Sequence, residues 1–431
     1  MKDFIKFIKS LIKRYSVGGF FLTSPQVASV FVGLVTLPIV LANLTVKDYG
    51  EFQFIQALQL WMITLTASYI TLGARRGIIK GLKGTFLFAF FSRLKLFAIL
   101  MLLVLLGASF IYYIGFITSS ILLIVMGAYL IIGYLPQISY LQFFIAKKQF
   151  KNYAIWQIIT SVLVSIASAY TAFATHDILI FAYVLFGLTS LMGLAGFFYV
   201  IFKNNLYSPY KRGEIDRTCF SYGIKLIPAS LISGTSNKIT SFIIGPFFGF
   251  ANLAVFSIAL RLEERFRGPT KSLQNLLYSD FVGIEQKELV SKIKMKLMQG
   301  LLLSTVFTLI CVFLGYLYID LFLPEAYQGA KLYFLILALG LPAVILQIIM
   351  HTILEANLRH RELTALIILP SILKILIIIL LGFLFGIIGI CFGVVLGYWI
   401  SLAFYYFLTI KRDLALKLIV KIPLLKKLAN F

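Results

Sequence analysis

Three cations inside long apolar segments are the residues of this chain best placed to do chemistry. Lys238, Arg261 and Lys374 each lie about ten or more residues from the nearest polar boundary, which in a helix is roughly 15 Å. A lysine side chain reaches only about 6 Å, too short to return the charge to water. Because a cation at the centre of a bilayer costs about 2.5–3.5 kcal/mol, such residues usually face a bundle interior or an aqueous cavity.

Five further charges follow Arg261, namely Glu263, Glu264, Arg265, Arg267 and Lys271. At 100° per residue, Arg261 and Arg265 share one broad helix face with Glu264. Glu263 and Arg267 lie on another face, at the i,i+4 spacing of an ion pair. The guanidinium fork suits phosphate oxygens, so the face of the first two arginines is predicted, together with Lys238 and Lys374, to bind phosphate. The alternatives are charges that pair with one another to fix a bundle, an early exit from the membrane, or a helix displaced at Pro370.

Two more arginines, Arg75 and Arg76, close the second apolar segment. They are placed to capture a lipid phosphate at the membrane surface. The alternative is that they are ordinary basic residues of a cytoplasmic loop.

Polar side chains in the first half could receive sugar hydroxyls. Gln53, Gln56 and Gln59 repeat every three residues at one end of the second segment. Further candidates of the same kind are Ser24, Gln26, Gln137 and Gln142. Hydrogen bonds between helices are the alternative role for such residues.

A third set of residues could bind and release protons during transport. His351 and Glu355 are four residues apart at the end of an apolar segment, and Glu264 lies among the charges described above. A pair of this kind could couple transport to protons, although an interfacial histidine without such a role is the alternative. The three cysteines and three histidines are scattered singly and no nucleotide-binding loop is present, so we expect no metal and no cofactor.

The elements that must position these residues follow from composition. Of 431 residues, 61% are hydrophobic and only 13% are charged, and the mean hydropathy is +0.98. A soluble chain would be about a quarter charged, so a water-soluble globular enzyme is excluded. The sequence predicts an all-α membrane protein of about twelve spans. We place the spans at 17–42, 52–73, 95–116, 120–146, 152–174, 179–202, 222–246, 251–273, 297–319, 332–354, 363–385 and 389–410.

The spans divide into two halves of six. Residues 15–202 are predicted to form one bundle and 222–410 a second, joined by a cytoplasmic linker over 203–221. The equal halves fit a duplication with pseudo-two-fold symmetry. The basic stretch 1–14 reads as an amphipathic interfacial helix, 74–94 as a second interfacial helix, and 411–431 as a basic tail.

The distribution of lysines and arginines among the loops predicts how the chain is oriented in the membrane. The termini and the five loops on one side carry 31 of the 39 lysines and arginines, whereas the opposite loops carry only Lys47 and Lys331. Both termini are therefore predicted to be cytoplasmic. The net charge of +23 is explained by an anionic leaflet rather than by nucleic acid.

Three local patterns carry a family resemblance. They are Leu37-Pro38-Ile39-Val40-Leu41-Ala42-Asn43 with Lys47-Asp48-Tyr49-Gly50-Glu51-Phe52, Asn237-Lys238 with Phe242-Ile243-Ile244-Gly245 and Ala254-Val255-Phe256-Ser257-Ile258-Ala259-Leu260-Arg261, and Leu321-Phe322-Leu323-Pro324-Glu325-Ala326-Tyr327-Gln328-Gly329-Ala330. With the span count and length, the chain resembles the Wzx-type polysaccharide exporters, which belong with the MATE transporters to the MOP superfamily. The family often has an acidic residue where Asn237 stands, which puts an ion role there in doubt.

The resemblance implies a V-shaped pair of six-helix bundles in a bacterial inner membrane. It implies a flippase that moves undecaprenyl-pyrophosphate-linked oligosaccharide, such as O-antigen units, from the inner to the outer leaflet by alternating access. The partners it implies are this lipid-linked oligosaccharide, membrane lipids, a glycan polymerase and chain-length proteins. Coupling to H⁺ or Na⁺, or to the membrane potential alone, is left open.

Two other functions were weighed. A MATE-like exporter of cationic drugs should have a site dominated by buried acids, whereas the deep charges here are mostly cationic. A membrane glycan polymerase should have a sizeable outer loop or catalytic carboxylates. The predicted outer loops are short and carry only the acids Asp48, Glu51, Asp177, Asp320 and Glu325. We therefore expect no enzyme activity.

Overall fold

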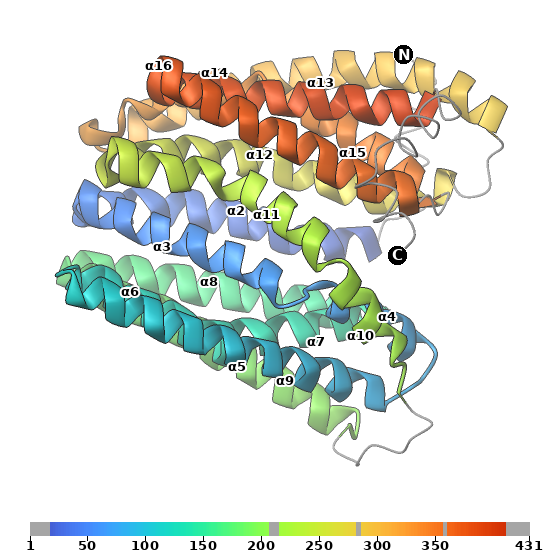
Figure 1. Ribbon diagram of the computed structural model, residues 1–431, viewed down its shortest axis with the longest axis horizontal. Helices are drawn as coiled ribbons and strands as arrows, with labels where there is room; N and C mark the ends of the chain where they lie inside the picture. Colours follow the sequence, from blue (N-terminus) through green and yellow to red (C-terminus); the bar gives the residue numbers. More distant parts are fainter. Residues whose placement is uncertain (1–17, 207–214, 282–285, 357–359, 411–431) are drawn as a thin grey trace. The chain divides into compact units, whose positions relative to one another are not determined.

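The computed structural model describes residues 18–206, 215–281, 286–356 and 360–410 (Figure 1). Every regular element in these ranges is a helix, which confirms the predicted all-α class. The predicted interfacial helix at 1–14 lies outside the described residues, as do the tail at 411–431 and the middle of the predicted linker.

Seven of the described helices are long and apolar enough to cross a membrane, or up to nine if each of two bent helix pairs is one span. The seven are α2 (Gly18–Asn43), α5 (Gly84–Tyr113), α6 (Ile117–Tyr129) continued through a π-helical turn into α7 (Leu135–Ala146), α8 (Phe150–Thr175), α9 (Ile178–Lys203), α13 (Gln286–Phe322) and α16 (His360–Ile410). The bent pairs are α3 (Val46–Leu65) with α4 (Tyr69–Ile79), and α14 (Ala330–Ala338) with α15 (Leu341–Ala356). The remaining helices are α10 (Thr218–Lys225), α11 (Ile227–Ile243) and α12 (Phe250–Phe281). The count of twelve membrane spans stays a prediction.

Contacts divide the chain into two compact units. One holds Phe21–Gly234, called here the first bundle, and the other, the second bundle, contains the described residues from Thr235 onward. The division falls inside α11 and not in the predicted linker at 203–221. The reason is close packing: a Cβ added to Gly223 would lie 2.2 Å from Ile70, and one added to Gly234 would lie 2.6 Å from Thr64. The start of α11 therefore packs with the first bundle.

The prediction for residues 74–94 is wrong in one respect. The chain turns after α4 and α5 begins at Gly84, well before the predicted third span, so Arg93 is a residue of a membrane-spanning helix. Its side chain is fully buried because the break between α3 and α4 supplies partners. The guanidinium donates from Nε to the carbonyl of Thr66 at 3.2 Å and from Nη1 to the hydroxyl of Thr71 at 2.8 Å. A charge that looks interfacial in the sequence is thus satisfied inside the bundle.

Helix α16 is two antiparallel arms. Gly386 has φ +63°, a conformation that favours glycine, and it interrupts the helix there. Beyond it the arms run side by side, since Cβ atoms added to Gly393 and Gly397 would lie 2.9 Å from the Cα of Ile378 and 2.5 Å from Cγ of Lys374. The arms coincide with the predicted spans at 363–385 and 389–410. This hairpin brings Lys374 beside the segment that contains Tyr398.

Aromatic packing fixes one end of the first bundle. Phe86 of α5 lies 5.4 Å from Phe143 of α7 and 5.5 Å from Phe197 of α9, measured between ring centroids. Phe90 contacts Phe197 at 4.4 Å. Such pairs contribute about 0.5–1.5 kcal/mol each beyond their burial. They hold the ends of α5, α7 and α9 in register.

Candidate functional site

Charged side chains from three helices meet in the second bundle. We call Lys238 of α11, Arg261, Glu263, Glu264 and Arg267 of α12, and Lys374 with Tyr398 of α16 the charged cluster. Helix α12 supplies most of it because its polar residues recur within two turns. The hairpin of α16 supplies the rest.

The guanidinium group of Arg267 contacts three side chains. Its Nη1 lies 3.8 Å from Oε1 of Glu263 and its Nη2 lies 3.9 Å from Oε1 of Glu264. Nη1 also donates to the Tyr398 hydroxyl at 3.4 Å, and the guanidinium carbon lies 5.8 Å from the centre of that ring. The predicted i,i+4 pair of Glu263 and Arg267 is confirmed. The separation of charges into two faces is too strict, because Arg267 also reaches Glu264.

Lys374 completes the cluster from the first arm of α16. Its ammonium lies 4.7 Å from the centre of the Tyr398 ring, within the range of a cation–π contact. The close approach at Gly397 leaves room for the alkyl stem, and Gln347 donates a hydrogen bond to the Tyr398 carbonyl. Lys374 thereby comes within electrostatic reach of Glu263, Glu264, Arg267 and Lys238.

Lys238 lies within electrostatic reach of Glu264, Arg261 and Arg267. Three of the predicted phosphate-binding residues, Lys238, Arg261 and Lys374, therefore belong to one neighbourhood. Arg265 is partly buried on the same helix as Arg261. Four cations stand against two acids in the cluster, an excess of two positive charges. That excess favours an anionic group, most strongly beside the buried part of the cluster at Glu263.

The remaining predicted phosphate ligands lie in the first bundle and differ from one another. Arg75 is partly buried and donates from Nε to the side-chain oxygen of Gln142, whereas Arg76 is exposed. Gln142 was predicted to contact glycan, so the structure joins two residues that the sequence assigned to separate roles. Arg76 is the one of the two arginines that is open to a ligand.

The predicted glycan contacts are mostly inside the first bundle. Gln53 and Gln59 are buried, at 6% and 4% exposed, while Gln56 is partly buried. The other three, Ser24, Gln26 and Gln137, are partly buried as well. Burial at Gln53 and Gln59 fits the alternative of hydrogen bonds between helices. A role in glycan binding stays a prediction for all of them.

Of the three predicted coupling residues, the structure describes the side chains of His351 and Glu264. The ring of His351 lies 6.1 Å from that of Tyr405, and the side chain of Glu355 lies outside the described residues. Glu264 belongs to the charged cluster and pairs with Arg267. Among the residues that the structure describes, no three His, Cys, Asp or Glu side chains gather as metal ligands do.

Sequence reasoning missed one member of the charged cluster. Tyr398 gave no signal, because a tyrosine in an apolar helix is common. Outside the spans, burial raises the pKa of the Cys219 thiol to about 11, and its Sγ lies 3.0 Å from the Asp216 carbonyl. A thiol with so high a pKa is a poor nucleophile at neutral pH.

Comparison with known proteins bears on the architecture. No family model matches the chain, and no curated protein matches it. Solved structures do. An inward-facing MATE-family multidrug transporter of the MOP superfamily superposes with a TM-score of 0.60 at 15% identity, covering 93% of this chain and 99% of that one. The MATE multidrug transporter DinF-BH, solved with a bound ligand, gives 0.67 at 11% identity, covering 94% and 95%.

A third structure is a MOP superfamily transporter from Pyrococcus furiosus, with a TM-score of 0.63, 16% identity and coverage of 93% and 96%. The chain has the MATE-like transporter fold. Because the likeness extends over nine-tenths of each chain, the MATE-like fold accounts for both bundles. At these identities it establishes the fold alone. The function of this chain must be argued from its own residues.

Proposed function

We propose that the protein is a membrane transporter that carries an undecaprenyl-pyrophosphate-linked oligosaccharide, of the O-antigen or a related surface polysaccharide, from the inner to the outer leaflet. The observation that carries this proposal is the excess of cations over acids in the charged cluster. A pyrophosphate brings two or more negative charges to such a site. Alternating access between the two bundles would expose it to each side in turn.

The arrangement suits pyrophosphate in two ways. Arg267 is oriented by Glu263, Glu264 and Tyr398, so little side-chain entropy remains to be lost when a ligand binds. Lys238 and Lys374 add ammonium groups, which act on phosphate as point charges without a bidentate geometry. The prenyl tail of the substrate would stay in the lipid, and the glycan would meet polar side chains.

The membrane potential favours outward movement of the anionic head group. Each elementary charge moved across 100 mV is worth about 2.3 kcal/mol, so two negative charges leaving a negative interior gain roughly 4.6 kcal/mol. A coupling ion is therefore not required. His351 and Glu264 are the residues that would carry a proton if one were used.

One observation favours the alternative of a MATE-like exporter of cationic solutes. Glu263 is fully buried in the cluster, and a buried carboxylate is what a cationic substrate would require. Its ion pair with Arg267 counts against this role, because the arginine already neutralises the carboxylate. The Pyrococcus furiosus transporter is described by a reversed polarity of its binding pocket, so the MATE-like fold accommodates pockets of either sign.

The test follows lipid-linked oligosaccharide in cells depleted of the protein. Extraction of the lipid pool should show completed, unpolymerised units on the cytoplasmic side, together with loss of surface polysaccharide. A normal lipid pool and normal surface glycan would contradict the flippase and favour the exporter of cations. Units accumulating on the outer face would instead indicate a polymerase.

A matched pair of variants localises the effect. Lys374→Gln should fail to restore surface polysaccharide at normal protein abundance, and Arg261→Ala should fail similarly. Lys331→Gln is the control, because Lys331 pairs with Asp320 on a surface far in sequence from the cluster. Full rescue by Lys374→Gln and Arg261→Ala together would remove the cluster from the mechanism.

A further inference from the structure

A small basic pocket in the first bundle has no role in the transport proposed above. It is lined by residues of three connections, namely Ile78, Gly81, Leu82, Lys83, Phe86, Phe143, Lys147, Asn204 and Leu206. These residues come from the turn between α4 and α5, the end of α7 and the end of α9. All three connections are on the predicted cytoplasmic side.

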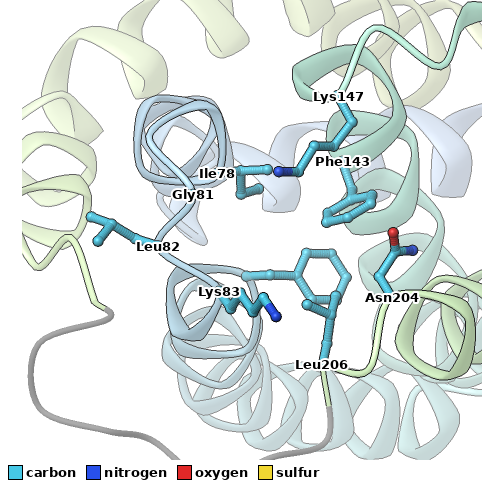
Figure 2. Close-up of a pocket in the computed structure, with 9 residues that line it drawn as sticks. Ile78, Gly81, Leu82, Lys83, Phe143, Lys147, Asn204 and Leu206 are labelled. Carbon is cyan, nitrogen blue, oxygen red and sulfur yellow. The ribbon is translucent and has the colours of Figure 1, made fainter.

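The cavity measures about 100 Å³. By the same measure a single water needs roughly 15 Å³, so the pocket has room for a group larger than one water. Two of its nine lining residues are cations, one is an amide and none is an acid. Figure 2 shows Lys147 on one side of the pocket, its amine ending beside Ile78, and Lys83 on the other side, extending toward Leu206.

The geometry of the rim is fixed by local structure. Gly81 has φ +83°, which turns the chain sharply between α4 and α5 and places Lys83 directly before the first residue of α5. Lys147 follows the last residue of α7. Asn204 follows α9, and its amide donates to the carbonyl of Val200 at 2.9 Å. The floor is the Phe86 and Phe143 pair described above.

We propose that this pocket binds a phosphate group at the cytoplasmic surface of the membrane, supplied by the headgroup of an anionic phospholipid. Two ammonium groups give the charge, and basic pockets between helices on the cytoplasmic side bind lipid headgroups elsewhere. Exposed apolar residues adjoin the lining: Ile79 is 67% exposed beside Ile78, and Phe202 is 66% exposed two residues before Asn204. They give acyl chains an apolar surface within reach of the pocket.

The test measures phospholipid binding to the purified full-length protein, so its outcome does not depend on the transported substrate. Delipidated protein in detergent would be titrated with phosphatidylglycerol, and bound lipid counted by native mass spectrometry. Lys83→Gln/Lys147→Gln should weaken binding about 30-fold, since each lysine near an anionic headgroup contributes about a fivefold factor.

The matched control is Lys80→Gln/Lys148→Gln, which removes two exposed lysines from the same two turns without touching the lining. It should stay within twofold of the unmodified protein. Equal weakening by both double variants would show a diffuse basic surface and overturn the pocket, as would no weakening by either. Lys83→Arg/Lys147→Arg keeps both charges and should retain binding, which guards against an effect of misfolding.

A competition experiment distinguishes a phospholipid headgroup from free inorganic phosphate as the ligand of the pocket. Millimolar inorganic phosphate should leave phosphatidylglycerol bound, because a headgroup anchored by acyl chains has the advantage of the lipid surface. Complete displacement by inorganic phosphate, with the same dependence on Lys83 and Lys147, would support the phosphate site with a soluble ligand as its occupant. Displacement that is indifferent to those two lysines would contradict the site.

Discussion

Arg93 in the first bundle and Arg267 in the second are both arginines of long apolar helices, yet they are satisfied by different partners. The partners that the structure gives Arg93 are neutral: the carbonyl and hydroxyl of Thr66, the hydroxyl of Thr71, and the rings of Phe97 and Tyr134 at 5.3 and 5.9 Å. Arg267 has two carboxylates, Glu263 and Glu264. One arginine closes a break in a helix and the other joins a network of charges.

The difference shows two ways in which a helical bundle satisfies an arginine. Arg93 is 0% exposed and its donors go to groups next to the bend of 52° between α3 and α4. It leaves no charge for a ligand to meet. Arg267 stands with Lys238, Arg261 and Lys374, whose charges exceed those of the two acids. The second arrangement carries net charge, whereas in the first the hydrogen bonds of the arginine go to neutral groups.

The largest effect on stability is expected from Arg267→Met. It removes one member of a pair whose other member, the Glu263 side chain, is 1% exposed, and breaking such a pair typically costs about 3–5 kcal/mol. Thermal unfolding of the purified protein would measure it. Glu263→Gln/Arg267→Met should recover most of the loss, because no carboxylate then remains buried without its arginine. Equal losses in the single and double variants would mean that Glu263 is not stabilised by Arg267.

Arg93→Met should cost less, about 2 kcal/mol. The substitution removes a buried charge together with its hydrogen bonds, and it strands no opposite charge. The exposed neighbour Lys95 provides a control on the same helix, and Lys95→Met should change stability by less than about 0.5 kcal/mol. A loss as large as that of Arg267→Met would erase the contrast between the two bundles.

The smallest effect is expected where the backbone approaches Lys374. In Gly397→Ala the new methyl would lie 2.5 Å from Cγ and 3.0 Å from Cβ of Lys374, so the two arms of α16 must move apart, at a cost of about 2 kcal/mol. The better helix propensity of alanine offsets about 1 kcal/mol, which leaves a net loss of about 1 kcal/mol. Gly187→Ala on α9 is the matched control, because no atom lies within 4 Å of its added Cβ. It should be neutral or stabilising by up to about 1 kcal/mol. Calorimetry would measure the unfolding of both variants. A Gly187→Ala protein as destabilised as Gly397→Ala would show that the loss does not come from the contact with Lys374.

Features that depend on neighbours in sequence were predictable. The helical class follows from the apolar runs, and the pair of Glu263 and Arg267 follows from the i,i+4 spacing that brings side chains together on any helix. The two arms of α16 were placed correctly because Gly386 interrupts a long apolar stretch. Lys238, Arg261 and Lys374 were selected because their depth in the membrane requires a polar neighbourhood.

Features that depend on distant residues were not predictable. Arg93 looks interfacial in the sequence because its acceptors are distant: Thr66 lies in the break after α3 and Thr71 lies in α4. Arg75 and Gln142 are 67 residues apart and were given separate roles, although they share a hydrogen bond. Tyr398 drew no attention, yet it contacts both Arg267 and Lys374.

The sequence by itself determined that this protein is helical, that it belongs in a membrane, and which of its charges must be accounted for. Those conclusions rest on hydropathy and helical periodicity, which are properties of short stretches. Only the tertiary structure decided that Lys374 and Arg267 share Tyr398 while Arg93 meets two threonines. Which side chains come together depends on how helices pack, and packing is set by contacts between residues that lie far apart in the chain.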